Sequence, residues 1–277
     1  IGGISTAGMA GMSSAQLAAL STAQIVALGT DQANALGTAQ LRGLGTHQLA
    51  ALATDDLVAM TTAQLAALTS VQLMALTATQ LDALSSDALG ALSAAQMRGI
   101  TSTALAALDS TDLGALTAAQ LGALSSSQLA GLATDALAGL STQALVGLTT
   151  AQVAGLVSSQ LGALSSDQWQ ALGSAQLRAL ATRALRDLGT DDLNGMSSSQ
   201  FGSLTTGQIA ALTSTQLGAL QTEDLAALTT SQVRAIESRD FADMDSADLG
   251  ALTSAQVAAL TTEQLRGIGS DDLAGLS

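Results

Sequence analysis

The feature that most constrains the fold of this chain is a period of eight residues, which runs without insertion or deletion from Ser5 to Leu276. This stretch divides into 34 octads with the consensus [S/T]-[S/T]-x-Q-L-x-A-L, seen cleanly at 61–68. Counting sites one to eight from Ser5, site eight is Leu, Met or Ile in all 34 octads, and site five is apolar in all of them. Such a period predicts a repeat architecture, in which a unit too small to fold alone is stabilised by stacking on its neighbours.

The spacing of the two apolar sites favours a helix within each octad. In a strand, sites five and eight would point to opposite faces, whereas in a helix they lie on one face. A continuous helix is excluded, because eight residues at about 100° each would rotate the apolar stripe by about 80° per octad. The sequence therefore predicts one short helix per octad, followed by a corner.

The polar sites agree with a helix that begins at site one. Ser or Thr at site one and Gln at site four have the spacing of a capping box, and Gln is present at site four in 21 octads. Of the 22 acidic residues, 19 lie at sites one, three or four, and six of the eight Arg lie at site six. This polarity matches the helix dipole, which favours anions at the N-terminus and cations at the C-terminus.

We therefore expect an all-α solenoid of 34 short helices, one per octad, forming a single repeat domain over 1–277. Sites five and eight point inward, sites three and six point outward, and small residues at site seven let helices approach closely. A 16-residue helical hairpin is not favoured, because Gln recurs at site four in consecutive octads, from Gln16 to Gln48. Handedness and the number of octads per superhelical turn stay open.

Composition excludes several classes of function. The formal net charge of −14 argues against nucleic acid or an anionic membrane surface as a partner. Apolar runs end after about four residues, far short of the ~20 needed to span a bilayer, so no membrane span is expected. No Cys is present to form disulfides or thiolate metal sites. The chain begins at Ile1, inside a repeat, and we expect it to be an excerpt or a processed product.

The sequence offers no catalytic or cofactor-binding constellation. The sole histidine, His47, occupies an outward site, and the aromatic residues Trp169, Phe201 and Phe241 occupy site five, where core filling is expected. The one departure with chemical content is 237–248, which holds five carboxylates in twelve residues. Of these, Asp240, Asp243, Asp245 and Asp248 are candidate Ca²⁺ ligands, although the spacing is not that of an EF-hand and lacks its glycine. A solvated acidic patch is the favoured interpretation.

Two resemblances bear on function. The stretch Leu148–Leu156 resembles the first helix of TAL effector repeats, which bind DNA, but only one octad is covered and the acidic surface opposes that activity. The whole array is similar to the octapeptide tracts, of the type LSTAQLxAL, found in very large secreted or surface adhesin-like proteins of bacteria. That resemblance implies an extracellular or cell-surface location.

We expect a structural protein without catalytic activity, which forms an extracellular filament, stalk or surface fibre and associates with copies of itself. The alternative is an adhesin-like binding or scaffold module that recognises a partner along the solenoid surface. Clustered aromatic or charged residues on one face would favour the alternative. The uniformity of the octads favours the structural role.

Overall fold

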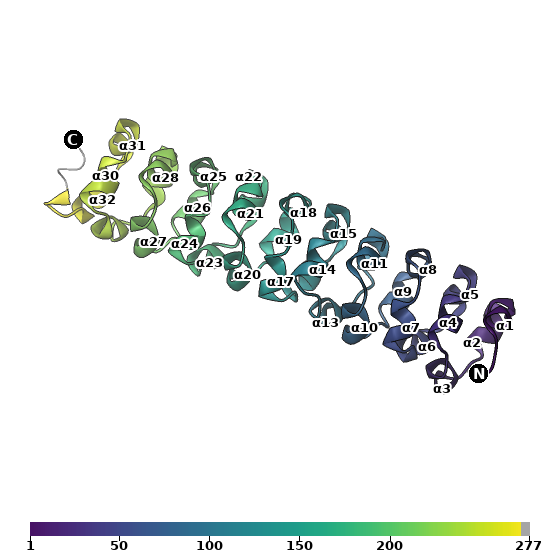
Figure 1. Ribbon diagram of the computed structural model, residues 1–277. Helices are drawn as coiled ribbons and strands as arrows, with labels where there is room; N and C mark the ends of the chain where they lie inside the picture. The colour runs from purple at the N-terminus through teal and green to yellow at the C-terminus, as the bar shows by residue number, and fades with distance from the viewer. Residues whose placement is uncertain (273–277) are drawn as a thin grey trace. The chain divides into compact units, whose positions relative to one another are not determined.

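The computed structural model describes residues 1–272, apart from the side chains of Ala242 and Asp243. All regular secondary structure in this range is helical, with 32 α-helices of four to six residues and one 3-10 helix (Figure 1). The predicted all-α solenoid is confirmed, with one short helix in each of the 33 octads from Ser5 to Ile268. The helix predicted for the last octad, 269–276, lies mostly outside the described residues. By its internal contacts the chain divides into two compact units, Ile1–Gly147 and Leu148–Ser277.

The first unit contains eighteen of these helices. Their bounds are α1 (Thr6–Gly11), α2 (Ser14–Ala18), α3 (Thr22–Val26), α4 (Thr30–Asn34), α5 (Thr38–Gly43), α6 (Thr46–Ala51), α7 (Thr54–Val58), α8 (Thr62–Ala67), α9 (Ser70–Leu73), α10 (Ala78–Asp82), α11 (Ser86–Gly90), α12 (Ala94–Met97), α13 (Ser102–Leu105), α14 (Ser110–Gly114), α15 (Ala118–Ala123), α16 (Ser126–Ala130), α17 (Thr134–Leu137) and α18 (Thr142–Val146).

The second unit continues the same pattern. Its elements are α19 (Thr150–Ala154), α20 (Ser158–Gly162), α21 (Ser166–Ala171), α22 (Ser174–Ala179), α23 (Thr182–Arg186), α24 (Thr190–Leu193), α25 (Ser198–Ser203), α26 (Thr206–Ile209), α27 (Ser214–Gly218), α28 (Thr222–Ala227), α29 (Thr230–Ala235), the 3-10 helix η1 (Asp240–Asp243), α30 (Ser246–Gly250), α31 (Ser254–Ala259) and α32 (Thr262–Gly267).

The capping box predicted from sites one and four is present in most octads. In α8, Thr61 Oγ1 accepts a hydrogen bond from the Gln64 amide at 3.3 Å, and Gln64 Oε1 accepts one from the Thr61 amide at 2.7 Å. The corner consists of extended residues at sites eight and one, such as Leu68 with φ −64° and ψ 143°. No residue in the described range has a positive φ. The corner therefore consists of extended residues beside the helix cap and requires no residue in the left-handed conformation that favours glycine.

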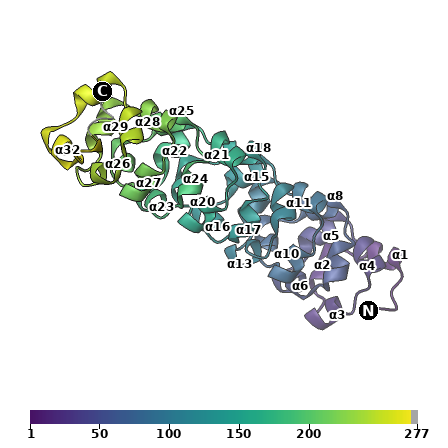
Figure 2. The ribbon, with the colours of Figure 1, turned by 60° about the vertical axis from the view of Figure 1, so that its left-hand side comes forward.

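Helices three octads apart pack against each other. In the first unit α5 contacts both α2 and α8, and in the second unit α25 contacts both α22 and α28. Along one side of the first unit, α5, α8, α11 and α15 follow one another (Figure 1), and α22, α25 and α28 do so in the second (Figures 1 and 2). One superhelical turn thus takes between three and four octads, a number that the octad pattern left open.

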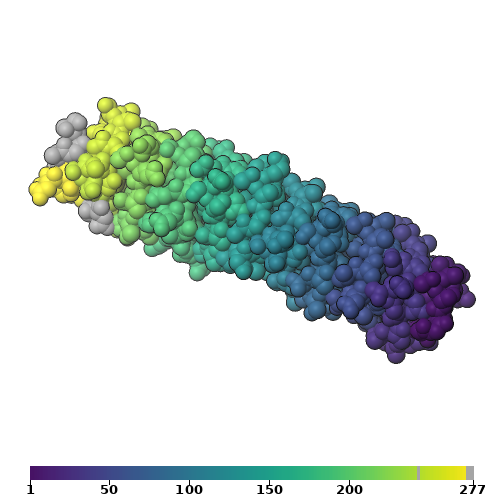
Figure 3. Space-filling view, viewed as in Figure 1, coloured from purple at the N-terminus to yellow at the C-terminus, as the bar shows by residue number. Residues whose placement is uncertain are grey.

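The core contains the residues expected there. Site five is almost completely buried through most of the chain, from Met9 to Leu249, and site-eight side chains are buried in nearly all octads from Leu28 onward. The large aromatic residues Trp169, Phe201 and Phe241 have no exposed surface. Exposed apolar side chains such as Val26, Val58 and Val71 lie at sites six and three, which confirms the outward sites. In the face visible in Figure 3, the side chains of each unit form a continuous surface over this core.

Small residues at site seven permit close helix contacts, as expected, and the contact is with the octad three positions earlier. A Cβ added to Gly43 would lie 2.7 Å from Ser14 Cβ. A Cβ added to Gly139 would overlap the carbonyl group of Ser110. Since these glycines have ordinary φ values, their role is to provide space at the contact.

Glutamine at site four makes a second set of contacts, which links octads four positions apart. Gln120 is 3% exposed. Its Oε1 accepts from the Thr117 amide at 2.8 Å, while its Nε2 donates to the carbonyl oxygens of Leu89 and Leu92, both at 2.8 Å. We call this arrangement a glutamine bridge.

Glutamine bridges occur throughout both units and share one register. The Nε2 group bonds the site-eight carbonyl oxygen 28 residues earlier, and in most cases also a carbonyl 30 or 31 residues earlier. Bridges of this kind are formed by Gln40, Gln48, Gln64, Gln72, Gln80, Gln96, Gln120 and Gln128 in the first unit, and by Gln176, Gln200, Gln208, Gln216, Gln232, Gln256 and Gln264 in the second. Each bridge satisfies a helix N-terminal donor and a corner acceptor with one buried side chain.

Candidate functional site

The octad 237–244, in the second unit, departs most from the repeat. Its helix is the 3-10 helix η1, which has no side-chain cap. Site one is Glu237, in place of the usual hydroxyl or glycine, and site four is Asp240 in place of glutamine. Neither partner of the capping box is therefore present here, although α7 and α28, which also lack a side-chain cap and the glutamine, remain α-helical.

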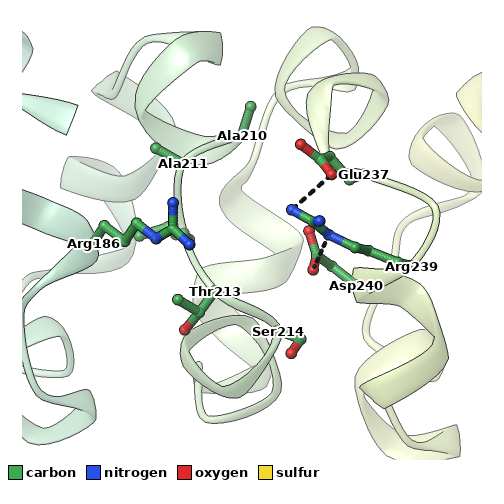
Figure 4. A pocket seen from close by; sticks show the side chains of 9 residues that line it. Arg186, Ala210, Ala211, Thr213, Ser214, Glu237, Arg239 and Asp240 are labelled. Carbon is green, nitrogen blue, oxygen red and sulfur yellow. Dashed lines mark ion pairs between the residues drawn. The ribbon is translucent and has the colours of Figure 1, made fainter. Parts of the chain in front are cut away.

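A cavity of about 340 Å³ lies beside this octad. Arg186, at the end of α23, lines one side, and Glu237, Arg239 and Asp240 line the other (Figure 4). Between them lie the corner after α26 and the start of α27, which contribute Ala210, Ala211, Leu212, Thr213 and Ser214. The guanidinium groups of Arg186 and Arg239 face each other across the space (Figure 4).

The two arginines differ in their partners. Arg239 Nη2 lies 2.8 Å from Glu237 Oε2, and Arg239 Nε lies 3.6 Å from Asp240 Oδ1. Arg186 forms no ion pair with any carboxylate among the described residues. The charges of the lining residues sum to zero, but they are unevenly distributed. The positive charge of Arg186 faces the cavity without an ion-pair partner among the described residues. This arrangement can hold an anionic group of a ligand, since guanidinium binds carboxylate or phosphate oxygens in two parallel hydrogen bonds.

Of the four candidate Ca²⁺ ligands, the three with described side chains, Asp240, Asp245 and Asp248, do not form one cluster. Asp245 Oδ1 accepts from the amides of Ala247 and Asp248 at 2.8 and 3.0 Å, and Asp248 Oδ2 accepts from the Asp245 amide at 3.1 Å. These two carboxylates cap α30. Asp240 is buried and paired with Arg239, and the side chain of Asp243 lies outside the described residues. Within 1–272, no three or more acidic or imidazole side chains with described positions converge in a way that could hold a metal ion.

Aspartate replaces glutamine at several buried site-four positions. Asp56, Asp112, Asp224 and Asp248 are each at most 9% exposed. Burial raises the pKa of all four carboxyl groups above its ordinary value, and the charges of acidic neighbours raise the pKa further. In all but Asp56, hydrogen bonds oppose part of this rise, such as the Ser198 side chain on Asp224. Asp56 Oδ2 is buried without any hydrogen-bond partner.

The remaining sequence candidates lie where they were expected. His47 is exposed on α6. No helix of the described chain has the length and apolar character needed to cross a bilayer. The glutamine bridges and the arginine-lined cavity were not anticipated. One signal for the bridges was present: Gln32, Gln40, Gln48 and Gln176 follow a glycine at site one, which has no hydroxyl to complete a capping box.

Comparison with known proteins gave one family. The family model described as the ALTTAQ repeat matches residues 1–38, 30–62, 49–86, 105–142, 169–206, 188–222 and 241–277, which together make up more than half of the chain. The matches fall in both compact units. A search of curated proteins gave no match.

Proposed function

Because the chain belongs to the ALTTAQ repeat family, we propose that it is a structural repeat protein that forms an extracellular filament, stalk or surface fibre of a bacterium and has no catalytic activity. The observation that carries this proposal is the glutamine bridge. Each bridge bonds one octad to the octad four positions earlier, so every added turn finds the donors and acceptors of the turn before it. A fibre can therefore grow by the addition of turns that all use the same hydrogen bonds, and no different interface is needed.

Self-association is the second part of the proposal. Gln16 and Gln24 are exposed, and their Nε2 groups bond no acceptor among the described residues, although their Oε1 atoms complete capping boxes. In the second unit, the site-eight carbonyl oxygens of Leu260 and Ile268 receive no hydrogen bond from the described residues. These donors and acceptors match those of an internal bridge. Further octads of the same polypeptide or a second copy of the chain can supply both; we propose the second copy, because head-to-tail contacts of this type continue as open filaments.

The test is electron microscopy and sedimentation of the purified chain at rising concentration. We expect filaments whose length grows with concentration. The double variant Gln16→Glu/Gln24→Glu keeps both capping acceptors but removes both donors, so its filaments should be shorter. The control Ala23→Glu adds a charge at an exposed site of the same helix and should assemble like the parent. A fixed particle size at all concentrations would refute self-association.

A second candidate function, favoured by the cavity at Arg186, is a binding or scaffold module whose partner presents an anionic group. Arg186→Gln should weaken binding of a small dicarboxylate probe at least about tenfold, because a bidentate charged contact is lost. Arg183→Gln is the matched control, since Arg183 lies on the same helix and pairs with Asp187 at 3.7 Å. Calorimetric titration that shows equal weak binding to both variants and the parent would remove this candidate.

A further inference from the structure

The site-four aspartates occupy the position of a bridging glutamine but lack its donor. For Asp56 the equivalent acceptor is the carbonyl oxygen of Leu28, 28 residues earlier. The flanking bridges fix this register: Gln48 donates to Leu20 at 2.7 Å and Gln64 donates to Leu36 at 2.8 Å. The carbonyl oxygen of Leu28 receives no hydrogen bond in the described chain. When site four holds a carboxylate, the carboxylate oxygen and the site-eight carbonyl oxygen of the adjacent turn are both acceptors. No hydrogen is then available to form a bond between them.

The same donor is missing at the other three positions. The acceptors 28 residues before Asp112, Asp224 and Asp248 are the carbonyl oxygens of Leu84, Met196 and Leu220, and none receives a hydrogen bond from the described residues. Asp112 and Asp248 use one carboxyl oxygen to accept the amide of their own site-one residue. In these two residues the other oxygen is free to carry a hydrogen.

We propose that Asp56, Asp112, Asp224 and Asp248 are proton-binding bridges, in which the protonated carboxyl group donates its hydrogen to the site-eight carbonyl oxygen four octads earlier. The proton takes the place of one hydrogen of the glutamine amide. In this form the bond between turns is restored. The solenoid therefore has more hydrogen bonds between its turns in mildly acidic solution than in alkaline solution.

The charges around these residues act in the same direction. For Asp56, the helices packed against α7 are α4 and α10, which carry Asp31 and Asp82, and its own helix carries Asp55. The helices packed against the other three are α11, α17, α25, α28 and α30, whose charged residues are all acidic. No cation on these helices stabilises the carboxylate form. Burial without a partner, as at Asp56 Oδ2, favours the neutral acid further.

The direction of the pH effect follows from linkage. The pKa of each carboxyl group is higher in the folded chain than in the unfolded chain, so the folded chain binds more protons between the two pKa values. The stabilising contribution is therefore complete below the unfolded pKa and is lost as the pH rises through the folded pKa. Acid strengthens the fold in this window, opposite to the usual behaviour of ion-paired carboxylates.

The test compares Asp56→Asn with Asp55→Asn in urea unfolding between about pH 8 and about pH 4.5, at low and high salt. Asparagine matches the protonated form of Asp56, so Asp56→Asn should move the neutral-pH midpoint to higher urea and reduce its dependence on pH. Asp55→Asn removes an exposed charge from the same helix and should keep the parent's pH dependence at high salt. Carbon-13 NMR titration of the parent should show the Asp56 carboxyl group protonating above the ordinary pKa of an aspartate side chain.

Two outcomes would overturn the proposal. One is an Asp56 carboxyl group that titrates at the ordinary pKa of an aspartate side chain, which would show that it is not held in the acid form by burial. The other is an equal loss of pH dependence in both variants, since that would assign the effect to general repulsion within an acidic chain. The NMR titration uses the parent chain, so it decides the question even if Asp56→Asn fails to fold.

Discussion

Replacing Gln120 by Glu is expected to destabilise the folded chain by about 3–5 kcal/mol at neutral pH, the range seen when a buried charge is left unpaired. The two side chains have the same shape, so Glu still accepts from the Thr117 amide. The second carboxylate oxygen then faces the carbonyl oxygens of Leu89 and Leu92, to which Gln120 Nε2 now donates at 2.8 Å. Two attractive contacts become repulsive in a position that is 3% exposed. Urea unfolding followed by circular dichroism measures the loss.

The matched control is Gln24→Glu. Gln24 occupies the same site and forms the same capping box with Ser21, but it is exposed and its Nε2 bonds no acceptor in the described chain. Glutamate near a helix N-terminus is favourable, so the unfolding midpoint of this variant should stay close to that of the parent. Equal destabilisation by Gln24→Glu and Gln120→Glu would mean that the cap, and not the bridge, holds the turns together.

Replacing Leu140 by Asp should be as damaging. Leu140 is a site-eight residue with 3% of its surface exposed, and Asp there loses the apolar contact and places a charge in the core. We expect a loss of at least about 3 kcal/mol in the free energy of unfolding. Hydrogen exchange should show the first loss of protection in the octad packed against it, which begins at Asp109, because each turn contacts mainly its neighbours.

Ala138→Asp serves as the control for Leu140→Asp. Ala138 lies two residues earlier, at site six, and its side chain is exposed. A surface substitution of this kind changes stability by no more than about 0.5 kcal/mol. Comparable damage from both variants, or none from either, would show that the inward and outward sites have been assigned wrongly.

Part of this architecture could be predicted because it is local. The cap between Thr61 and Gln64 joins residues three positions apart, and the i,i+3 spacing of Leu65 and Leu68 places both on one face of the same helix. These contacts form within a single octad, so its eight residues hold all the information. The same reasoning predicted that Trp169 and Phe201 fill the core, and both are completely buried.

The acidic segment shows where local reasoning stops. The concentration of five carboxylates in twelve residues made Asp240, Asp243, Asp245 and Asp248 candidate Ca²⁺ ligands. In the structure Asp245 and Asp248 bond the first turn of α30, while Asp240 lies in the preceding octad beside Arg239. The cavity next to it depends on Arg186, which lies more than 50 residues away in sequence. No spacing within the segment could have shown that arrangement.

The sequence by itself determined one helix per octad, its beginning and end, and which sites face the core. Tertiary structure alone decided that a turn takes between three and four octads, and with it which groups meet across turns. The physical reason is that a bond such as that from Gln120 to Leu92 joins residues 28 positions apart. Its geometry depends on small rotations summed over every corner between them, and the octad fixes each corner only approximately. When a turn closes, Gly139 packs against Ser110 and each bridging glutamine donates to a carbonyl oxygen. Only a rotation that satisfies all of these contacts at once is selected.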